Sequence, residues 1–245
     1  MPAGAKALPI QPRIRQIEYI GDSSMSGFGA RSATRECSGE EQRLTSDTQS
    51  AYPALVAEHF NADYQINAIS ARGVVRNYAG LAPERVMPKV YAYATTDRWE
   101  RYRNPGWQPQ IVVIKLNADF VGDLTPLERW KSFAQVAKDY VKGYSDFVAE
   151  VHRRSPGAAI LIAGFGARHI PDADLMRTLE AGERSIAAAA RAAGVRSIDF
   201  IDLEAMPLER TACSAHHSLG DHRRIASGLI AYLEGRPDLW NVKTP

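Results

Sequence analysis

The segment IRQIEYIGDSSMSGFG, residues 14–29, is a β-branched apolar run followed directly by a turn rich in glycine and serine. This pattern predicts a strand over residues 14–20 and a tight turn after it. The turn presents Ser23 beyond the carboxyl end of the strand, at the edge where open parallel sheets bind ligands. Ser23 is therefore a candidate nucleophile beside backbone N–H groups that stabilise negative charge, although a serine that only caps a helix gives the same pattern.

Short apolar runs alternate with stretches of helical periodicity along the whole chain. Strands are predicted at 14–20, 64–68, 111–116, 158–163 and 197–201. Helices are predicted at 51–60, from the Thr125-Pro126 cap through Val151, at 175–193 and at 220–233, and residues 72–110 are predicted as loops over the sheet edge. The alternation indicates an α/β fold whose parallel sheet is covered on both faces. We expect a single domain over 1–245, with 1–12 as a flexible N-terminal segment.

The composition excludes several classes of protein. Of the 245 residues, 45% are hydrophobic and 24% charged, which argues against a disordered or fibrous chain. The 30 Lys and Arg residues are interspersed with 28 Asp and Glu residues, so we expect no nucleic-acid partner. No run reaches the roughly 18 apolar residues of a membrane span, so we expect no membrane partner. The start of the chain lacks the apolar stretch of a secretory signal, although a mature form with its signal removed would look the same.

Polar residues also follow the next two predicted strands and precede the last predicted helix. Gly73 follows the second strand and can bring its backbone N–H close to a substrate, and Asn117 follows the third strand with an amide donor. In the loop 213–222, a neutral histidine could take the proton of Ser23 and return it to the leaving group. Together these loops predict nucleophilic catalysis with a serine, a histidine and oxyanion donors.

These blocks resemble the SGNH/GDSL hydrolases, and within them the catalytic domain of the family 2 carbohydrate esterases, over nearly the whole chain from Arg15. The resemblance rests on the segments 18–23, 51–55, 70–77, 112–120 and 213–222. It implies a three-layer α/β/α sandwich with a flavodoxin-like five-stranded parallel sheet. It also implies a serine esterase that removes acetyl groups from sugar esters, with no metal or organic cofactor. Ser23 is then the nucleophile and His216 the base, with oxyanion donors from the Ser23 N–H, the Gly73 N–H and the Asn117 amide.

Two positions depart from the family's pattern. The third block usually runs Gly-x-Asn-Asp, whereas the segment LNAD at 116–119 is one residue shorter, so either Asn117 acts from a shifted loop or the oxyanion asparagine is lost. Residues 213–215 are Cys, Ser and Ala, so no carboxylate precedes His216 in the place of the usual triad acid. Some family 2 esterases work as a Ser-His dyad, in which a backbone carbonyl preserves the required tautomer. Asp202, just past the last strand, is a second candidate for orienting the imidazole.

The two cysteines, Cys37 and Cys213, lie far apart in sequence, and their number alone allows either a disulfide in an oxidising compartment or two unrelated thiols. The cysteine usage of the resembled family favours the disulfide, which would join the serine side to the histidine loop. We expect a secreted or periplasmic mature form, with a cytoplasmic location left open. Full-length family members usually carry an N-terminal β-sandwich, for which this chain has no room. Its contacts are expected to be absent or to come from the partner subunit of a homo-oligomer.

For substrate binding we expect contacts from five residues, Asp22, Arg72, Tyr78, Trp99 and Trp107. The aromatic ones, with Tyr102, occupy a loop-rich region. They could form a wall on which sugar rings stack, or they could anchor the loops to the core. The sugar and the acyl group are not specified by the sequence.

Other interpretations of the same residues are weaker or stay open. Cys213, His216, His217 and His222 have zinc-ligand chemistry, but only the distant Cys37 could complete the set, so no metal site is predicted. The segment GDSSM at 21–25 lacks the second glycine of an α/β-hydrolase elbow, and no complete dinucleotide fingerprint is present. Two other functions stay open: a non-catalytic carbohydrate-binding protein on a degenerate hydrolase scaffold, and a sugar O-acyltransferase.

Overall fold

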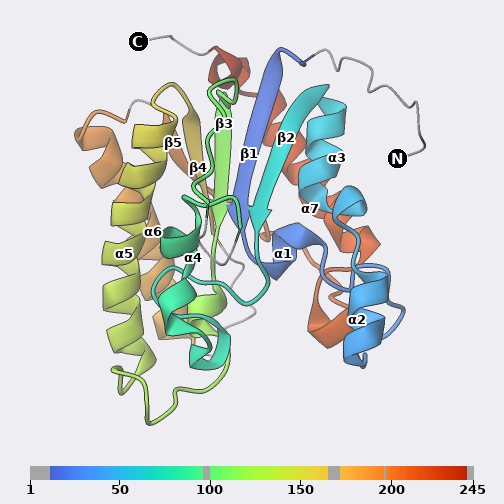
Figure 1. Cartoon of the computed structure of the whole chain (residues 1–245), viewed down its shortest axis with the longest axis vertical. Helices are drawn as coiled ribbons and strands as arrows, with labels where there is room; N and C mark the ends of the chain where they lie inside the picture. Colours follow the sequence, from blue (N-terminus) through green and yellow to red (C-terminus); the bar gives the residue numbers. More distant parts are fainter. Residues whose placement is uncertain (1–11, 96–99, 165–171, 196, 242–245) are drawn as a thin grey trace.

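The computed structural model describes residues 12–95, 100–164, 172–195 and 197–241. Its centre is one parallel sheet with the strand order β2-β1-β3-β4-β5 (Figure 1). The strands are β1 (Arg15–Gly21), β2 (Ala62–Ala68), β3 (Ile111–Lys115), β4 (Ala159–Gly164) and β5 (Ile198–Asp202). All five predicted strands are confirmed, with ends that shift by one or two residues. Of the predicted flexible segment 1–12, residues 1–11 lie outside the described residues.

Helices cover both faces of the sheet, which confirms the predicted three-layer sandwich. The α-helices are α1 (Ser23–Ser26), α2 (Gly39–Thr45), α3 (Tyr52–His59), α4 (Met87–Val90), α5 (Phe133–Arg154), α6 (Ala173–Ala192) and α7 (Leu219–Glu234). The short 3-10 helices are Thr48–Ser50, Tyr78–Gly80, Pro83–Arg85, Ala118–Phe120, Cys213–Ala215 and Pro237–Trp240. Helices α5 and α6 pack side by side on one face, and α3 and α7 pack side by side on the other (Figure 1). None of the helices within the described residues is long and apolar enough to cross a membrane.

The predicted start of α5 is wrong. The Thr125-Pro126 pair begins only a local turn, in which the Thr125 N–H donates to Glu128 Oε2 at 2.7 Å. Glu128 also accepts from the guanidinium of the buried Arg76, so the turn is held to another loop instead of continuing as a helix. The helix begins at Phe133, where the Ser132 hydroxyl accepts the Gln135 N–H.

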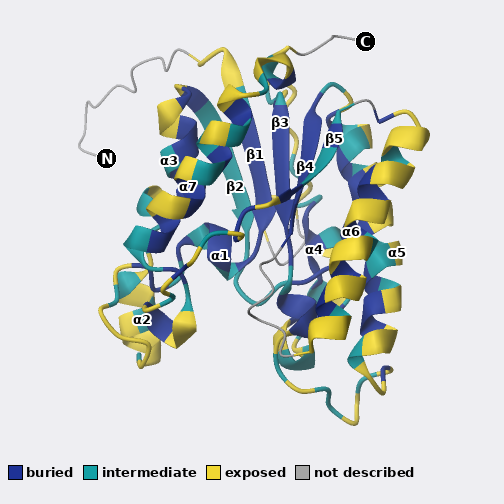
Figure 2. Ribbon diagram, turned by 180° about the vertical axis from the view of Figure 1, so that it is seen from behind, coloured by how far each residue is buried: buried dark blue, intermediate teal, exposed yellow. Residues whose placement is uncertain are grey.

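Alternating residues of the strands feed two hydrophobic cores, one on each face of the sheet. In β3, Val112 and Ile114 pack with the core of α5 and α6, whereas Ile111 and Val113 pack with the core of α3 and α7. Figure 2 shows the buried residues on the strands and on the helix surfaces turned towards them. Burial on both faces explains why the central strands read as continuous apolar runs.

The carboxyl ends of the strands carry the loops that the sequence marked as polar. Helix α1 begins directly after β1, Asn117 follows β3, and the loop before α7 returns to the same edge (Figure 1). Two segments almost 200 positions apart in sequence therefore meet at the end of β1.

Candidate active site

Ser23 and His216 are in direct contact at the carboxyl edge of the sheet. The Ser23 hydroxyl lies 2.9 Å from His216 Nε2, and His216 Nδ1 lies 2.9 Å from the carbonyl oxygen of Cys213. A carbonyl oxygen can only accept, so Nδ1 carries the proton. In the neutral ring Nε2 is then the acceptor, and the Ser23 O–H donates to it. This geometry provides a serine whose proton has an immediate acceptor.

The surroundings keep the His216 imidazole neutral. Burial lowers the pKa of His216, although the Cys213 carbonyl and the Asp22 carboxylate act in the opposite direction. The ring of Phe28 packs against the imidazole, with 4.6 Å between ring centroids. A neutral imidazole with a defined tautomer is the form that can act as a general base.

A short, tightly held loop supplies the Cys213 carbonyl. Cys213 forms a disulfide with Cys37, which confirms the predicted pairing. The backbone at Ser214 and Ala215 is left-handed, with φ values of 52° and 59°, and the Ser214 N–H donates to the carbonyl of Arg35 at 2.7 Å. Left-handed backbone in non-glycine residues persists only where the surroundings enforce it. The disulfide and the Arg35 contact therefore hold a conformation that the loop would not prefer alone.

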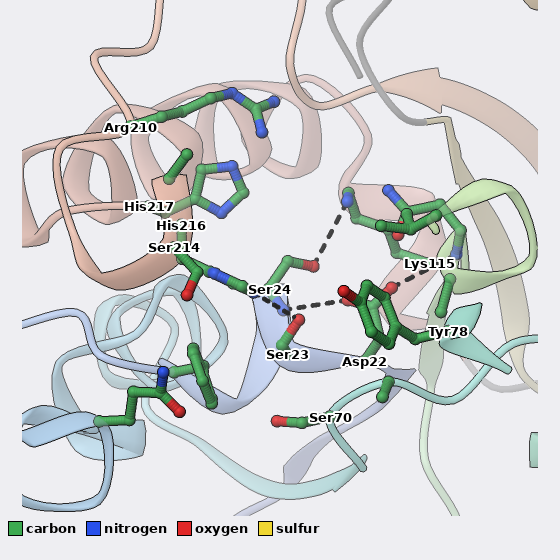
Figure 3. Close-up of a pocket in the computed structure, with 17 residues that line it drawn as sticks. Asp22, Ser23, Ser24, Ser70, Tyr78, Lys115, Arg210, Ser214, His216 and His217 are labelled. Atoms are coloured by element: carbon green, nitrogen blue, oxygen red, sulfur yellow. Dashed lines mark hydrogen bonds between the residues drawn. The ribbon is translucent and has the colours of Figure 1, made fainter. Parts of the chain in front are cut away.

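A cavity of about 490 Å³ opens above this pair (Figure 3). It is lined by Asp22, Ser23, Ser24, Phe28, Gln42, Ser70, Ala71, Tyr78, Lys115, Asn117, Ala118, Val121, Arg210, Ser214, Ala215, His216 and His217. The cavity thus brings together five of the expected site residues: Asp22, Ser23, Tyr78, Asn117 and His216. Tyr78 lies at the mouth of the cavity with 45% of its surface exposed, where a ligand can reach its ring.

Asp22 lines the cavity, but its carboxylate binds backbone instead of facing a ligand. Its Oδ1 accepts the Ser24 N–H at 3.0 Å, and its Oδ2 accepts the Asn117 N–H at 3.3 Å. Only 3% of Asp22 is exposed. Asp22 thus connects the start of α1 to the loop after β3, which fixes Ser23 relative to Asn117, and its contact with a substrate stays a prediction.

Gly73 is not placed as an oxyanion donor. Its N–H donates to Asn77 Oδ1 at 3.2 Å, and Gly73 is absent from the described residues that line the cavity. A Cβ at this position would meet the Arg76 carbonyl oxygen at 2.1 Å and Asp119 Oδ2 at 2.3 Å. The glycine is thus required for a tightly packed turn. Ser70 and Ala71, just before it, are the residues of this loop that reach the cavity.

Asp119 organises this turn from the neighbouring loop. Its carboxylate is fully buried and accepts the backbone N–H groups of Val74, Val75 and Arg76 at 2.8, 2.7 and 2.8 Å. The sequence contained Asp119 in the third block but gave no indication that it closes the second block.

The other residues predicted to contact the substrate lie in different places. Arg72 is not among the described residues that line the cavity, and none of the described residues forms a hydrogen bond with its enclosed Nε. Trp107 and Tyr102 line a different cavity on the sheet face. Trp99 lies outside the described residues. Of the predicted aromatic wall, Tyr78 is the member within the described residues that lines the catalytic cavity, because Tyr102 and Trp107 face the other one.

Charged residues beside the cavity were missed by sequence reasoning. Lys115 Nζ lies 2.9 Å from Glu204 Oε1 and donates to Ser24 Oγ at 3.3 Å (Figure 3). Arg210 also pairs with Glu204, and His217 Nε2 lies 3.5 Å from it. Burial opposes ionisation of Glu204, but Lys115, His217 and Arg210 together outweigh it and hold the pKa of that carboxyl well below its usual range. A lysine that ends the otherwise apolar run IVVIK was the signal available in the sequence.

The other residues of the histidine loop have structural contacts. Asp202 is exposed and accepts the Glu204 N–H at 3.0 Å, so the Cys213 carbonyl, not this carboxylate, orients His216. His222 is buried in α7, where its Nδ1 accepts the Tyr52 N–H at 3.2 Å. The Cys213 sulfur is bonded to Cys37 and is not available as a thiolate ligand.

Comparison with known proteins agrees with this geometry. The sequence pattern of the GDSL-like lipase/acylhydrolase family matches residues 19–226. The chain belongs to this family. It is 34% identical over 237 residues to an acetylxylan esterase/glucomannan deacetylase of Cellvibrio japonicus, covering 96% of this chain and 63% of that protein. The chain thus spans less than two thirds of this relative's length. The cellulase/esterase CelE of Acetivibrio thermocellus is 31% identical over 153 residues, which cover 61% of this chain and 17% of that protein.

Solved structures share the fold of this chain. A carbohydrate esterase described as having divergent catalytic and non-catalytic binding functions in its active site is 33% identical, with a TM-score of 0.85. That match covers 95% of this chain and 72% of the other. A family two carbohydrate esterase from Clostridium thermocellum in complex with cellohexaose matches with a TM-score of 0.78. At 22% identity, over 96% of this chain and 67% of the other, it supports the fold alone.

Proposed function

We propose that this acylhydrolase removes acetyl groups from carbohydrate esters by a Ser-His mechanism. The observation that supports the proposal best is the 2.9 Å contact between Ser23 Oγ and His216 Nε2, with Nδ1 held by the Cys213 carbonyl. The similarity to an acetylxylan esterase/glucomannan deacetylase suggests acetylated plant polysaccharides as the substrate class.

In the first half of the reaction, Ser23 Oγ attacks the carbonyl carbon of the ester while His216 Nε2 takes the hydroxyl proton. The carbonyl oxygen becomes an oxyanion. Collapse of this intermediate breaks the bond to the sugar oxygen, which receives the proton back from His216. The products are a free sugar hydroxyl and an acetyl-Ser23 ester.

In the second half, a water molecule attacks the acetyl-Ser23 ester and gives a proton to His216. Collapse releases acetate and restores the Ser23 hydroxyl. The imidazolium that forms in each half donates Nδ1–H to Cys213 throughout. A carbonyl stabilises this charge less than a carboxylate does, so the dyad relies more on the fixed tautomer than on charge pairing.

The oxyanion requires donors that already point at its position. The Ser23 N–H is in the first turn of α1, where it has no partner within the helix. The side-chain amide of Asn117 lines the same cavity from the loop after β3. We therefore assign the oxyanion to Ser23 and Asn117, and Gly73 contributes by the packing of its turn.

The test is acetate release from acetylated xylan, acetylated glucomannan and 4-nitrophenyl acetate. Ser23→Ala and His216→Ala should each lower kcat by at least about a thousandfold, because nucleophile and base act as a unit. Tyr232→Phe removes a hydroxyl bound to Asp199 near the amino end of β5, away from the carboxyl edge that carries Ser23, and serves as a control for protein preparation. Release that is equal in wild type and Ser23→Ala would refute the mechanism.

Two other outcomes would assign the protein differently. Binding of the acetylated polysaccharide without any acetate release would identify a carbohydrate-binding protein. Acetylated oligosaccharides that form when an acceptor sugar is added, in place of free acetate, would identify an acyltransferase.

We also propose that the protein works in an oxidising compartment, as a secreted or periplasmic mature form. The Cys37–Cys213 disulfide supports this, because such bonds persist mainly outside the reducing cytosol. Titration of free thiols in protein taken directly from its native cell should find none. Two titratable thiols per chain would contradict the proposal.

A further inference from the structure

A second cavity of about 500 Å³ lies over the sheet face at its β2 edge. It is lined by Glu18, Gln65, Ile66, Asn67, Tyr91, Tyr93, Ala94, Tyr102, Asn104, Trp107, Gln108, Arg154 and Ser155. These residues come from β1, β2, the end of α5 and the chain between α4 and β3 (Figure 1). Among the described lining residues, the two cavities have no member in common. It is therefore a separate site from the Ser23 cavity.

Strand β2 shows that this face of the sheet is built for polar contacts. Tyr64, Ile66 and Ala68 pack against the core of α3 and α7. The alternate residues Gln65 and Asn67 line the second cavity. Strands of parallel sheets are usually apolar on both faces because helices cover both. In β2 the second face is instead polar and partly exposed, beneath the chain that leads to β3.

A buried carboxylate lies on this face. Only 4% of Glu18 is exposed, and its Oε1 accepts both Asn67 Nδ2 at 2.7 Å and the Tyr91 hydroxyl at 2.8 Å. The Nε1–H of Trp107, in the same lining, is enclosed and has no acceptor among the described residues. A buried polar atom left without a partner is unusual and points to a missing ligand or water.

The lining of the cavity contains both aromatic rings and side-chain amides. Tyr93, Tyr102 and Trp107 are partly exposed, and the Tyr102 hydroxyl accepts Gln65 Nε2 at 2.5 Å. The Tyr91 ring is instead covered by the Arg154 guanidinium, 4.5 Å from its centroid, and forms a fixed wall. Flat apolar ring faces beside amide donors and acceptors match a sugar, whose C–H faces are apolar and whose edges carry hydroxyls.

The charges of the lining favour an uncharged ligand. The lining contains one carboxylate, Glu18, and one guanidinium, Arg154, so that the formal charges of the lining cancel. An anionic sugar would face Glu18 at close range, which disfavours it.

We propose that this second cavity binds a neutral oligosaccharide, independently of the Ser23 site. Such a site would hold a polysaccharide chain on the protein while esters are presented elsewhere. The proposal depends on binding alone, so it stands or falls separately from the esterase assignment.

The experiment uses the full chain after Ser23 has been blocked with a small phosphonate that reacts with serine hydrolases, or as Ser23→Ala if the phosphonate does not react. Xylohexaose and cellohexaose are titrated by calorimetry, with hexagalacturonate as an anionic comparison. Trp107→Ala removes a ring of the lining, and Gln108→Ala removes an exposed amide of the lining. Arg103→Ala, exposed in the same segment but not lining the cavity, is the matched control.

We expect at least one neutral hexasaccharide to bind the protein with Ser23 blocked. Trp107→Ala should weaken binding by about tenfold or more, Gln108→Ala by less, and Arg103→Ala not at all. The Trp107 indole N–H resonance, identified by its loss in Trp107→Phe, should shift during titration, which tests the site without relying on stability. Thermal melting and 4-nitrophenyl acetate turnover should be unchanged by the control Arg103→Ala. The absence of binding, tighter binding of hexagalacturonate, or equal affinity for Trp107→Ala and wild type would overturn the proposal.

Discussion

The carbonyl oxygen of Cys213 accepts the Nδ1–H of His216 at 2.9 Å, in the position that a carboxylate takes in a catalytic triad. The same carbonyl also accepts the His216 backbone N–H at 3.0 Å. A side chain can be removed by mutation, but a backbone carbonyl cannot. The orientation of His216 therefore depends on whatever holds residues 213–215 in place.

The disulfide is the first of these restraints, and we predict that its removal lowers both activity and stability. In the Cys37→Ala/Cys213→Ala double variant, kcat should fall by about tenfold to a hundredfold, because small displacements of the base are costly. The free energy of unfolding should fall by about 2–5 kcal/mol. Ester hydrolysis and urea unfolding measure these effects, and reduction of the wild type should reproduce the loss of activity. Full activity in the double variant would show that the Arg35 contact is sufficient.

The pH dependence of catalysis follows from the burial of His216. Because burial lowers the pKa of this imidazole, the neutral base persists below pH 6.5. The acid limb of kcat/KM for 4-nitrophenyl acetate should therefore have its midpoint below pH 6.5, with a plateau above it. Rates recorded between pH 4 and 8 test this. A midpoint above 6.5 would mean that the imidazolium is stabilised, contrary to the buried site described.

Stability should depend on pH through a different histidine. Burial lowers the pKa of His222 to about 3, from 6.5 in the unfolded chain. Above pH 6.5 the group is neutral in both states and has no effect. As the pH falls from 6.5 towards 3, His222 becomes protonated in the unfolded state but stays neutral in the folded state. The free energy of unfolding should then decrease by about 1.4 kcal/mol per pH unit from this group.

Urea unfolding at pH 7, 5.5 and 4 measures this contribution. His222→Gln keeps an acceptor for the Tyr52 N–H but cannot take up the proton. Its stability should be less sensitive to acid than that of the wild type. Equal slopes for both proteins would assign the acid sensitivity to other groups.

Asn117 is predicted to act in the transition state more than in substrate binding. Asn117→Ala should lower kcat by about 10²–10³-fold with little change in KM, because an oxyanion donor is used only as charge develops. Asn241→Ala, at an exposed amide that lines neither cavity, is the control and should leave turnover of small esters unchanged. A rise in KM alone would place the Asn117 amide against the substrate.

Asp119 is predicted to hold the loop between β2 and α4 together. Its replacement by asparagine leaves at least one of three backbone N–H groups without an acceptor and should destabilise the fold by about 1–3 kcal/mol. Asp123 is exposed and follows Asp119 in the same loop. The control Asp123→Asn should change the free energy of unfolding by less than about 0.5 kcal/mol. Chemical unfolding compares the two variants, and similar stabilities would mean that water replaces the lost acceptor.

Much of this architecture could be predicted from local sequence. Strand periodicity and the turn after β1 placed Ser23 at the correct edge, and the loop before α7 placed His216 there. The position of Gly73 could not be predicted in this way. Its N–H is taken by Asn77, and its turn is closed by Asp119, whose partner Val74 lies 45 positions away, beyond the reach of any local periodicity.

The aromatic residues show the same limit. Tyr78 and Trp107 belong to one loop-rich stretch of sequence, yet they line different cavities. Composition identifies such residues as ligand contacts but does not give the direction of the loop that bears them.

The covalent link between Cys37 and Cys213 joins positions separated by 176 residues. Most of the molecule is therefore a closed ring with two tails. A protease that cuts one exposed loop inside the ring opens it without releasing a fragment, so the nicked protein stays in one piece until a reductant arrives. In a medium rich in proteases, a single cut of this kind would leave the two pieces of the chain covalently joined.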